Sequence, residues 1–368
     1  MTRKIQSFLA ACTVFGALST CLKADLLDST NSLRVSFPDA RLTVNGLAWF
    51  NEDRATLRRL PLRLKDTFRA PVWSLAQDTS GGRIRFKTDS TRIGLRAKSP
   101  DTSGMHHMTT IGQSGFDIYI NNEYMGSAWP DNSGDIVKEW TVGTNRALRD
   151  VTLYLPLYKG VAIQEVILES DAKIEPPPPF ARSKPVVYYG SSITQGGCAS
   201  NPGLSCQAQL SRWLNLDFIN LGFSGNGLGE PAIADAVSEI DASCFVLDYW
   251  GNPSAEVYRD TLPTFVQTLR KRYHQTPILI TGPYFFPSET LTARNAGPLT
   301  EKRTTAKQFV ANQRRAGDKF IAYVDGLEML SREQAFGLVD GVHCNSLGFY
   351  FCAKGLEPHL RKALKLRP

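Results

Sequence analysis

The sequence has few of the residues that build metal and redox centres. It contains 5 His among 368 residues, and none of its 7 Cys residues belongs to a C-x-x-C pair. Structural zinc sites and thioredoxin-like centres therefore lack their usual ligand spacing. Five Cys follow residue 24, an odd number, so at least one thiol stays free in a monomer. The local disulfide options are Cys198 with Cys206 and Cys344 with Cys352, and both stay open.

Long apolar runs are also scarce, and the most prominent one, Ile5–Leu18, lies close to the N-terminus. Two basic residues precede it, and small and polar residues follow up to Ala24. This pattern is typical of a secretory signal peptide and is too short and too polar for a good membrane span. We expect cleavage near Ala24 and a secreted or periplasmic protein without a membrane span. A loose lipoprotein-box pattern makes lipid anchoring at Cys21 the alternative.

A strong charge imbalance is absent as well. The formal net charge is +7, and residues 1–24 carry three basic and no acidic residues, so the mature chain has +4. The basic residues are scattered except in Arg54–Arg69, where they are mixed with Leu and indicate a solvated face. We therefore expect no nucleic-acid partner. Nothing in the pattern indicates an oligomeric state.

The clearest break in the chain is a run of four prolines at 176–179. Proline lacks an amide donor and stiffens the backbone, so the run predicts a semi-rigid linker. The mature chain is longer than a usual single domain. We divide it into a signal peptide (1–24), an N-terminal domain (25–175), a linker (176–184) and a C-terminal domain (185–368).

The N-terminal domain is patterned as short strands. Several segments alternate apolar with polar residues or combine strand-forming residues between turn clusters, and this predicts a β-sandwich of jelly-roll-like type. The clearest of these segments are Arg83–Lys87, Ile93–Arg96, Phe116–Ile120 and Val151–Leu157.

The C-terminal domain alternates strands with helices, which predicts an α/β fold with a parallel five-stranded sheet between two helical layers. Sites in such sheets form beyond the carboxyl ends of the strands. The expected strands are Pro185–Tyr189, Leu216–Leu221, Cys244–Tyr249, Ile278–Thr281 and Phe320–Val324. The expected helices are Gln207–Leu214, Pro231–Ile240, Ala255–Tyr273, Thr300–Arg315 and Ser346–Leu364.

Ser192 lies in the turn after the first of these strands. A serine hydroxyl is a weak nucleophile and needs a base. The surrounding pattern is not G-x-S-x-G, so a nucleophile elbow of the α/β-hydrolase kind is not indicated. The base is found at the other end of the domain, where Asp340 stands three residues before His343. His343 would take the Ser192 proton, and Asp340 would hold the imidazole ring.

Two further segments follow strands at the same predicted edge. One contains Gly225 and the other contains Asn252. Acyl transfer builds negative charge on the carbonyl oxygen, and fixed donors stabilise that charge. The backbone N–H groups of Ser192 and Gly225, with the Asn252 side-chain amide, predict an oxyanion hole.

The ordered set of Ser192, Gly225, Asn252 and Asp340-x-x-His343 resembles the SGNH (GDSL-type) hydrolases, and the resemblance covers roughly Pro185–Leu364. It implies a flavodoxin-like sheet and ester hydrolysis. Upstream, Gly115–Tyr119 resembles the G-x-D-L-Y signature of an N-terminal β-sandwich in one bacterial branch. That branch is associated with carbohydrate esterases, which often remove O-acetyl groups.

Together, the signal pattern, the Ser-His-Asp set and the resemblance predict a secreted serine esterase that forms an acyl-enzyme and requires no metal or organic cofactor. Its expected partner is an acylated carbohydrate or another small ester, with a carbohydrate O-acetyl group favoured. Three alternatives stay open: a lipid or aryl-ester esterase, an acyltransferase with the same triad, and a non-catalytic carbohydrate-binding protein.

The sequence departs from the family pattern in three places. Ser191 stands where the wider family usually has Asp, and Asn345 stands where this branch often has Pro. Tyr249 and Trp250 are bulkier than expected before Asn252. These two aromatic residues are candidate substrate contacts.

Several other residues have two possible roles. Glu230 is a further candidate substrate contact, with helix stabilisation as its alternative. A structural role is favoured over catalysis for Asp248, a surface loop over a metal pair for His106-His107, and sandwich packing over stacking on sugar for Trp129 and Trp140.

Overall fold

The computed structural model describes residues 25–291 and 296–367. The expected signal peptide and Cys21 lie outside the described residues, so export, cleavage near Ala24 and lipid anchoring stay predictions. Within the described ranges, no helix is both long and apolar enough to span a bilayer.

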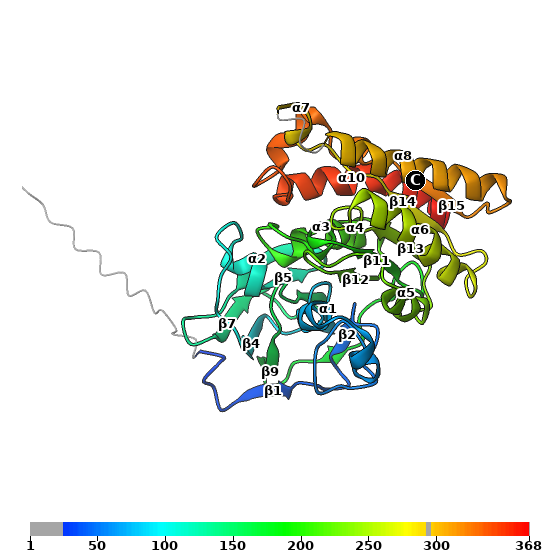
Figure 1. The fold of residues 1–368 in the computed structure, drawn as a ribbon. Coiled ribbons are helices and arrows are strands. Elements are labelled where there is room, and N and C mark those ends of the chain that lie inside the picture. The colour runs from blue at the N-terminus through cyan, green and yellow to red at the C-terminus, as the bar shows by residue number, and fades with distance from the viewer. Residues whose placement is uncertain (1–24, 292–295, 368) are drawn as a thin grey trace, which may run out of the picture.

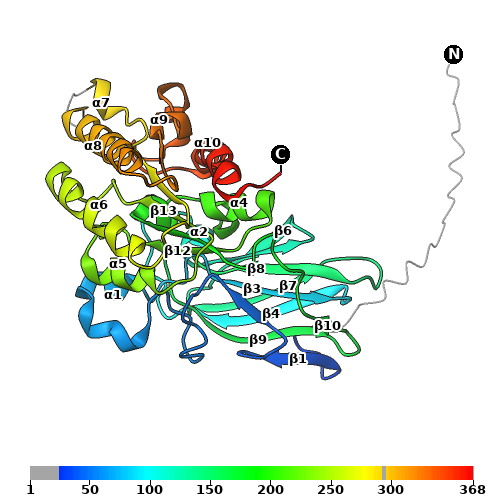
Figure 2. The same ribbon diagram turned by 90° about the vertical axis from the view of Figure 1, so that its right-hand side faces the viewer.

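The N-terminal half consists of two antiparallel sheets (Figure 2). The four-stranded sheet has the order β1 (Ser32–Ser36), β9 (Ala162–Glu169), β4 (Arg92–Lys98), β7 (Asp135–Thr141). The second sheet has the order β10 (Ile174–Glu175), β3 (Arg83–Thr88), β8 (Arg149–Tyr154), β5 (Phe116–Ile120), β6 (Glu123–Ala128), and β2 (Thr43–Asn45) pairs with β3. Two short helices, α1 (Ala70–Leu75) and α2 (Thr110–Ser114), and the 3-10 helix η1 (Leu62–Thr67) complete this half.

The core of this half forms because side chains alternate between the two faces of each strand. Ile84 and Phe86 of β3 and Val151 and Leu153 of β8 are fully buried in one apolar cluster. Trp140 joins the same cluster, as the packing interpretation predicted, but that prediction is wrong for Trp129, which is 52% exposed. The β-rich N-terminal half confirms that part of the fold prediction.

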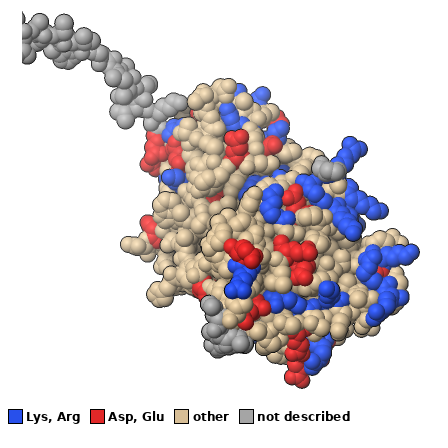
Figure 3. Space-filling view, turned by 90° about the horizontal axis from the view of Figure 1, so that it is seen from above, with Lys and Arg blue, Asp and Glu red and all other residues tan. Residues whose placement is uncertain are grey.

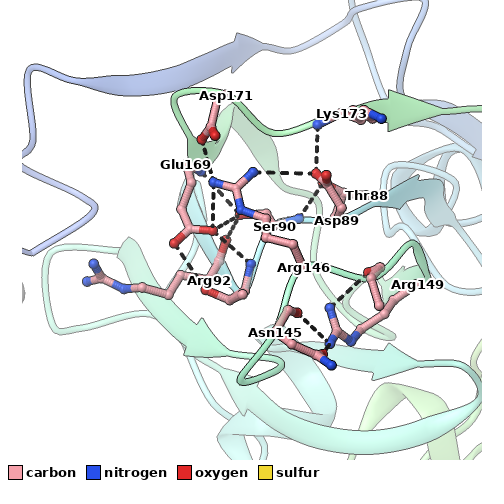
Figure 4. Close-up of polar contacts among 12 residues, drawn as sticks. Thr88, Asp89, Ser90, Arg92, Asn145, Arg146, Arg149, Glu169, Asp171 and Lys173 are labelled. Atoms are coloured by element: carbon pink, nitrogen blue, oxygen red, sulfur yellow. Dashed lines mark hydrogen bonds and ion pairs between the residues drawn. The ribbon is translucent and has the colours of Figure 1, made fainter.

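A polar cluster joins the loops at one end of the sandwich (Figure 4). Arg146, from the loop before β8, pairs with Asp171 and lies 3.7 Å from Asp89 and 3.5 Å from Glu169. Glu169 also accepts a hydrogen bond from the Thr91 backbone at 2.9 Å. The cluster ties the β3–β4 and β9–β10 turns to the loop before β8. Because Arg146 is partly exposed, each ion pair contributes only a little stability.

The C-terminal half contains a five-stranded parallel sheet. Its order is β12 (Phe218–Gly222), β11 (Val186–Gly190), β13 (Cys244–Asp248), β14 (Ile278–Thr281), β15 (Ile321–Val324). All five residues of β11 are buried, as expected for a parallel strand covered on both faces. Helices lie on both sides of the sheet in Figures 1 and 2, which confirms the predicted three-layer α/β/α architecture.

The helices fall into two packed groups. One group holds α4 (Cys206–Leu214) and α10 (Ser346–Leu364), and the other holds α5 (Pro231–Ser238), α6 (Ala255–Arg270) and α8 (Ala296–Arg315). The short helices and 3-10 turns are α3 (Ser192–Gln195), α7 (Ser288–Leu291), α9 (Gly326–Met329), η2 (Pro202–Leu204) and η3 (Arg332–Gly337). From above, this half shows Lys and Arg interspersed with Asp and Glu among uncharged residues (Figure 3).

The two halves share one apolar core and several buried polar contacts. Trp49, Tyr154 and Tyr158 of the sandwich half pack in the same cluster as the sheet of the C-terminal half. Arg59 is 1% exposed and donates to the backbone carbonyls of Leu75 and Gly222. The prediction of a solvated face over Arg54–Arg69 is therefore wrong for Arg59, which is inserted between the two halves.

The residues of the G-x-D-L-Y-like segment also lie at this contact. Asp117 is fully buried and accepts a hydrogen bond from the Gly203 backbone at 2.8 Å. Tyr119 lies under the Arg212 guanidinium, 4.2 Å from ring centroid to Cζ. Both contacts reach from β5 to the η2–α4 region. The segment therefore helps to hold the two halves together.

Candidate active site

Ser192 begins helix α3 directly after strand β11. Ser191 forms the N-cap, and its hydroxyl accepts a hydrogen bond from the Ile193 backbone at 3.2 Å. A side chain at Gly190 would collide with Thr194, so only glycine fits at the end of the strand. The turn is thus tight, and it brings the Ser192 side chain to the carboxyl edge of the sheet.

His343 and Asp340 lie in the loop before α10 and face Ser192. Ser192 Oγ is 2.8 Å from His343 Nε2, and His343 Nδ1 is 2.7 Å from Asp340 Oδ2. Asp340 Oδ1 also accepts from the backbone N–H groups of Val342 and His343, at 3.0 and 2.8 Å. The structure therefore brings the three predicted triad residues into one continuous hydrogen-bonded chain.

These hydrogen bonds set the charge of Asp340. Partial burial acts to raise its pKa, but the hydrogen bonds from His343 and Val342 outweigh that effect and lower the pKa to about 2. The carboxylate is therefore ionised at neutral pH. An ionised Asp340 can hold the His343 ring and stabilise an imidazolium that forms beside it.

The three predicted oxyanion groups surround the same opening. Ser192, Gly225 and Asn252 line a depression of about 290 Å³ together with His343 and Phe286. Asn252 Oδ1 accepts from the Gly227 N–H at 3.0 Å. Because a backbone N–H can only donate, this contact fixes the amide orientation and leaves the Asn252 NH₂ group for the depression.

Gly225 adopts a left-handed conformation with φ of +68°, and no atom lies within 4 Å of the position that a Cβ would take. Among the described residues, its N–H has no hydrogen-bond partner. A free N–H at an open position is what an oxyanion donor requires.

The sandwich half supports this site from beneath. Tyr158 donates from its hydroxyl to the Ser192 carbonyl at 3.1 Å. Gln195 accepts from the Ser224 N–H at 3.0 Å and donates to Asp78 Oδ2 at 2.8 Å. Since Ser224 precedes Gly225, this relay connects the sandwich half to the oxyanion segment. No motif in the sequence indicated Tyr158 or Asp78, because both reach the site only through the tertiary contact.

The candidate substrate contacts lie elsewhere. Tyr249 is fully buried and packs against Tyr189, Tyr258 and Phe265. Trp250 is 1% exposed and donates to Asp248 at 3.0 Å. Neither lines the depression. Both are buried, and the Trp250 ring packs against that of Phe286, which does line the depression, at 5.9 Å between ring centroids.

Glu230 does not line the depression either. It forms an ion pair with Arg69 of the sandwich half at 2.5 Å and stands at the N-cap position of α5. Asp248, in contrast, has the structural role expected for it. It accepts hydrogen bonds from Thr194 and Trp250, at 2.8 and 3.0 Å, and from Thr281. Burial raises its pKa, and these hydrogen bonds oppose the rise.

Comparison with known proteins decides the family. The profile of the GDSL-like Lipase/Acylhydrolase family matches residues 183–361. The profile for the N-terminus of Esterase_SGNH_hydro-type, called GxDLY, matches residues 35–174. A putative GDSL-like lipase from Bacteroides ovatus is 30% identical, with a TM-score of 0.83 over 92% of this chain and 99% of the other. The chain belongs to the GDSL-like (SGNH) lipase/acylhydrolase family.

Two further structures share the fold of this GDSL-like protein. The salicylyl-acyltransferase SsfX3 from a tetracycline biosynthetic pathway is 22% identical, with a TM-score of 0.78 over 92% of this chain and 100% of the other. A family two carbohydrate esterase from Clostridium thermocellum, in complex with cellohexaose, is 15% identical, with a TM-score of 0.59 over 78% of this chain and 93% of the other. No curated protein matches the sequence.

The departures from the GDSL pattern have local structural reasons. Ser191, in place of the usual Asp, supplies the cap of α3. Asn345 caps α10, and its side chain accepts from the backbone N–H groups of Leu347 and Gly348 at 3.0 and 2.9 Å. Ser191 keeps a side-chain acceptor at a helix N-terminus, and Asn345 supplies one that proline would lack.

The histidine pair 106–107 is exposed, as expected for a surface loop, but its second member has a position that the sequence did not indicate. The His107 ring lies 5.8 Å from the His343 ring, measured between centroids. Cys198 lies beside them and is buried. Burial, with the nearby charge of Asp340, raises the pKa of the Cys198 thiol to about 12, so this thiol is protonated at neutral pH.

The five Cys after residue 24 are unpaired in the structure. The sulfur atoms of Cys344 and Cys352 lie 3.8 Å apart, in contact but not bonded. Cys198 and Cys206 are both buried and separate.

Proposed function

We propose that this GDSL-like protein is an exported serine esterase in which Ser192 is the nucleophile, His343 the general base and Asp340 the residue that orients the histidine. The observation that best supports this proposal is the continuous chain of hydrogen bonds from Ser192 Oγ through both ring nitrogens of His343 to Asp340. The two donor–acceptor distances are 2.8 and 2.7 Å. Export rests on the N-terminal sequence pattern.

The proposed reaction follows from this geometry. Ser192 Oγ attacks the ester carbonyl carbon while His343 Nε2 takes its proton. Negative charge forms on the carbonyl oxygen, where the N–H groups of Ser192 and Gly225 and the Asn252 amide donate to it. His343 then returns the proton to the departing alcohol, which leaves an acyl-enzyme. Water activated by His343 releases the carboxylic acid and restores Ser192.

A short acyl group on a carbohydrate is the proposed substrate. The support is the fold shared with family two carbohydrate esterases, one of them in complex with cellohexaose. The open depression over Ser192 is compatible with a bulky alcohol portion that stays outside the protein. The partner is thus an acetylated oligo- or polysaccharide, with a lipid or aryl ester as the alternative within the same chemistry.

A second candidate reaction passes the acyl group from Ser192 to another alcohol. The observation that favours it is the fold shared with a salicylyl-acyltransferase, at a TM-score of 0.78 over 100% of that chain. Hydrolysis and transfer use the same acyl-enzyme and differ only in the attacking hydroxyl.

One experiment separates these functions. Aryl esters of increasing acyl length and acetylated polysaccharides are offered to the purified protein, with and without an added polyol, and the products are identified by mass spectrometry. Release of free acetate from the short ester and the polysaccharide supports the proposal. Acylated polyol as the main product supports the transferase. Sugar binding without turnover of any ester would support a non-catalytic binding protein and contradict the proposal.

A further inference from the structure

Three side chains of the kinds that bind transition metals meet beside the catalytic histidine. His107, Cys198 and His343 each offer a nitrogen or sulfur atom, and the three atoms all lie within 4.8 Å of one another. They come from three separate segments: the turn before α2, the loop after α3 and the loop before α10. Among the described residues, it is the one group of three His, Cys, Asp or Glu residues whose ligand atoms lie close enough to hold a metal ion.

The segments that carry these residues are fixed to one another. Thr109 donates from its hydroxyl to the Ser200 carbonyl at 2.7 Å, which joins the His107 turn to the Cys198 loop. Ser200 N–H in turn donates to the Ser346 hydroxyl at 3.0 Å, at the start of α10. A Cβ added at Gly197 would lie 3.5 Å from His343 Cδ2, so the Cys198 loop passes close to the histidine ring.

The donor set selects the kind of ion. Two imidazoles and one thiolate suit Zn²⁺ and related late transition metals, whereas Mg²⁺ and Ca²⁺ prefer oxygen ligands. Ligand atoms of a tetrahedral zinc site lie roughly 3.3–3.8 Å apart, as bond lengths of about 2.0–2.3 Å require. The three atoms here lie within 4.8 Å of one another, so ion binding draws them closer together, and His107 is the exposed member of the three.

Occupation of this site is incompatible with the triad. His343 Nε2 is 2.8 Å from Ser192 Oγ, and His343 Nδ1 is 2.7 Å from Asp340 Oδ2. Each ring nitrogen has one lone pair or one proton to share. A metal ion on either nitrogen therefore displaces one triad partner and removes the general base.

We propose that His107, Cys198 and His343 form an inhibitory site for Zn²⁺ or a similar ion. The ion binds the two imidazoles and the Cys198 sulfur, the thiol proton passes to solvent, and water completes the coordination. Bound metal switches off the reaction that the preceding section proposes, and chelation restores it. His107, a residue of the sandwich half, thus helps to bind the metal ion that inhibits the catalytic centre.

The kinetic test uses metal-free protein and an aryl acetate, with rates normalised to the metal-free rate of each variant. We expect Zn²⁺ to inhibit fully and EDTA to reverse the inhibition, whereas Mg²⁺ at the same concentration does not inhibit. His107→Ala and Cys198→Ser each raise the half-inhibiting Zn²⁺ concentration at least about ten-fold. His106→Ala is the matched control, because His106 is exposed in the same turn but outside the group, and it keeps the wild-type sensitivity.

Direct binding tests the site without any need for activity. Co²⁺ is added to the Ser192→Ala protein, and the near-ultraviolet charge-transfer absorption between sulfur and cobalt is recorded. We expect this absorption band in Ser192→Ala. We expect no band in the double variant that carries both Ser192→Ala and Cys198→Ser. The proposal is overturned if no such band forms, or if His107→Ala is as sensitive to Zn²⁺ as the wild type. A band in Ser192→Ala, together with a wild-type protein that hydrolyses no ester, would uphold the metal site and reject the proposed function.

Discussion

Tyr158, a residue of the sandwich half, donates its hydroxyl hydrogen bond to the backbone carbonyl of Ser192 at 3.1 Å. Both groups are buried, so this bond is shielded from competition by water. The same carbonyl also accepts from the backbone N–H groups of Gly196 and Gly197 at 3.1 and 2.8 Å. The N-terminal half is therefore part of the framework that holds the Ser192 turn.

Tyr158→Phe tests this support. The change removes the hydroxyl and leaves the ring, so we expect a loss of about 1 kcal/mol in the free energy of unfolding. We also expect kcat to fall several-fold while KM changes little, because the Ser192 turn loses one of its fixed contacts. Denaturant unfolding and steady-state kinetics measure the two effects. An unchanged kcat would mean that the two glycine N–H groups suffice to fix the turn.

Asn252→Asp tests the oxyanion hole. The carboxylate keeps an oxygen for the Gly227 N–H, so the local fold should persist, but it cannot donate and it places negative charge beside the developing oxyanion. We expect kcat to fall by about 10²–10³ with little change in the unfolding midpoint. A loss of less than five-fold would remove Asn252 from the oxyanion hole.

Asp340→Asn tests the third member of the triad. The amide keeps an oxygen for the backbone N–H groups of Val342 and His343, but the negative charge that stabilises an imidazolium is lost. We expect kcat to fall by about 10³–10⁴ in a folded protein. The pKa of about 2 adds a second expectation. Because this folded pKa lies below the usual one, the stability that Asp340 contributes is present above about pH 4 and is lost as the pH falls through about 2.

The clearest sequence predictions concern features that are local in the chain. Continuous apolar runs identified β11 and β13, and the order of motifs identified Ser192, Asp340 and His343 as one site. Residues that reach the site across the contact between the halves were not predicted. Tyr158, Asp78 and His107 are brought next to Ser192, Gln195 and His343, respectively, only when the two halves pack together.

Side-chain direction was the second source of error. Tyr249 and Trp250 follow β13 at the carboxyl edge, but sequence alone does not tell on which side of the edge each ring packs. Arg59 lies in a segment with the composition of a solvated face, yet its guanidinium is buried between the two halves. There it donates to backbone carbonyls of both halves, and its Cζ lies 4.8 Å from the centroid of the Phe223 ring.

Asp78→Asn tests the buried relay that reaches the oxyanion segment. Burial raises the pKa of Asp78 to about 6, although Arg59 and the hydrogen bond from Gln195 oppose the rise. Because the folded pKa exceeds the unfolded one, ionisation costs stability as the pH rises from about 4 through about 6. We expect the wild type to lose unfolding free energy relative to Asp78→Asn over this interval.

The measurement is chemical denaturation of both proteins at pH 4 and pH 7. Asparagine keeps an oxygen that can accept from Gln195 and does not titrate, so the difference between the two proteins isolates the carboxyl group. Parallel stability curves would show that Asp78 does not titrate in this interval.

The most direct test of the account is the rate of aryl acetate hydrolysis by Ser192→Ala, with its folded state checked by circular dichroism. Loss of the nucleophile should reduce kcat by at least about 10³, with an unchanged spectrum. A folded Ser192→Ala protein that hydrolyses the ester at the wild-type rate would contradict the assignment of Ser192 as the nucleophile.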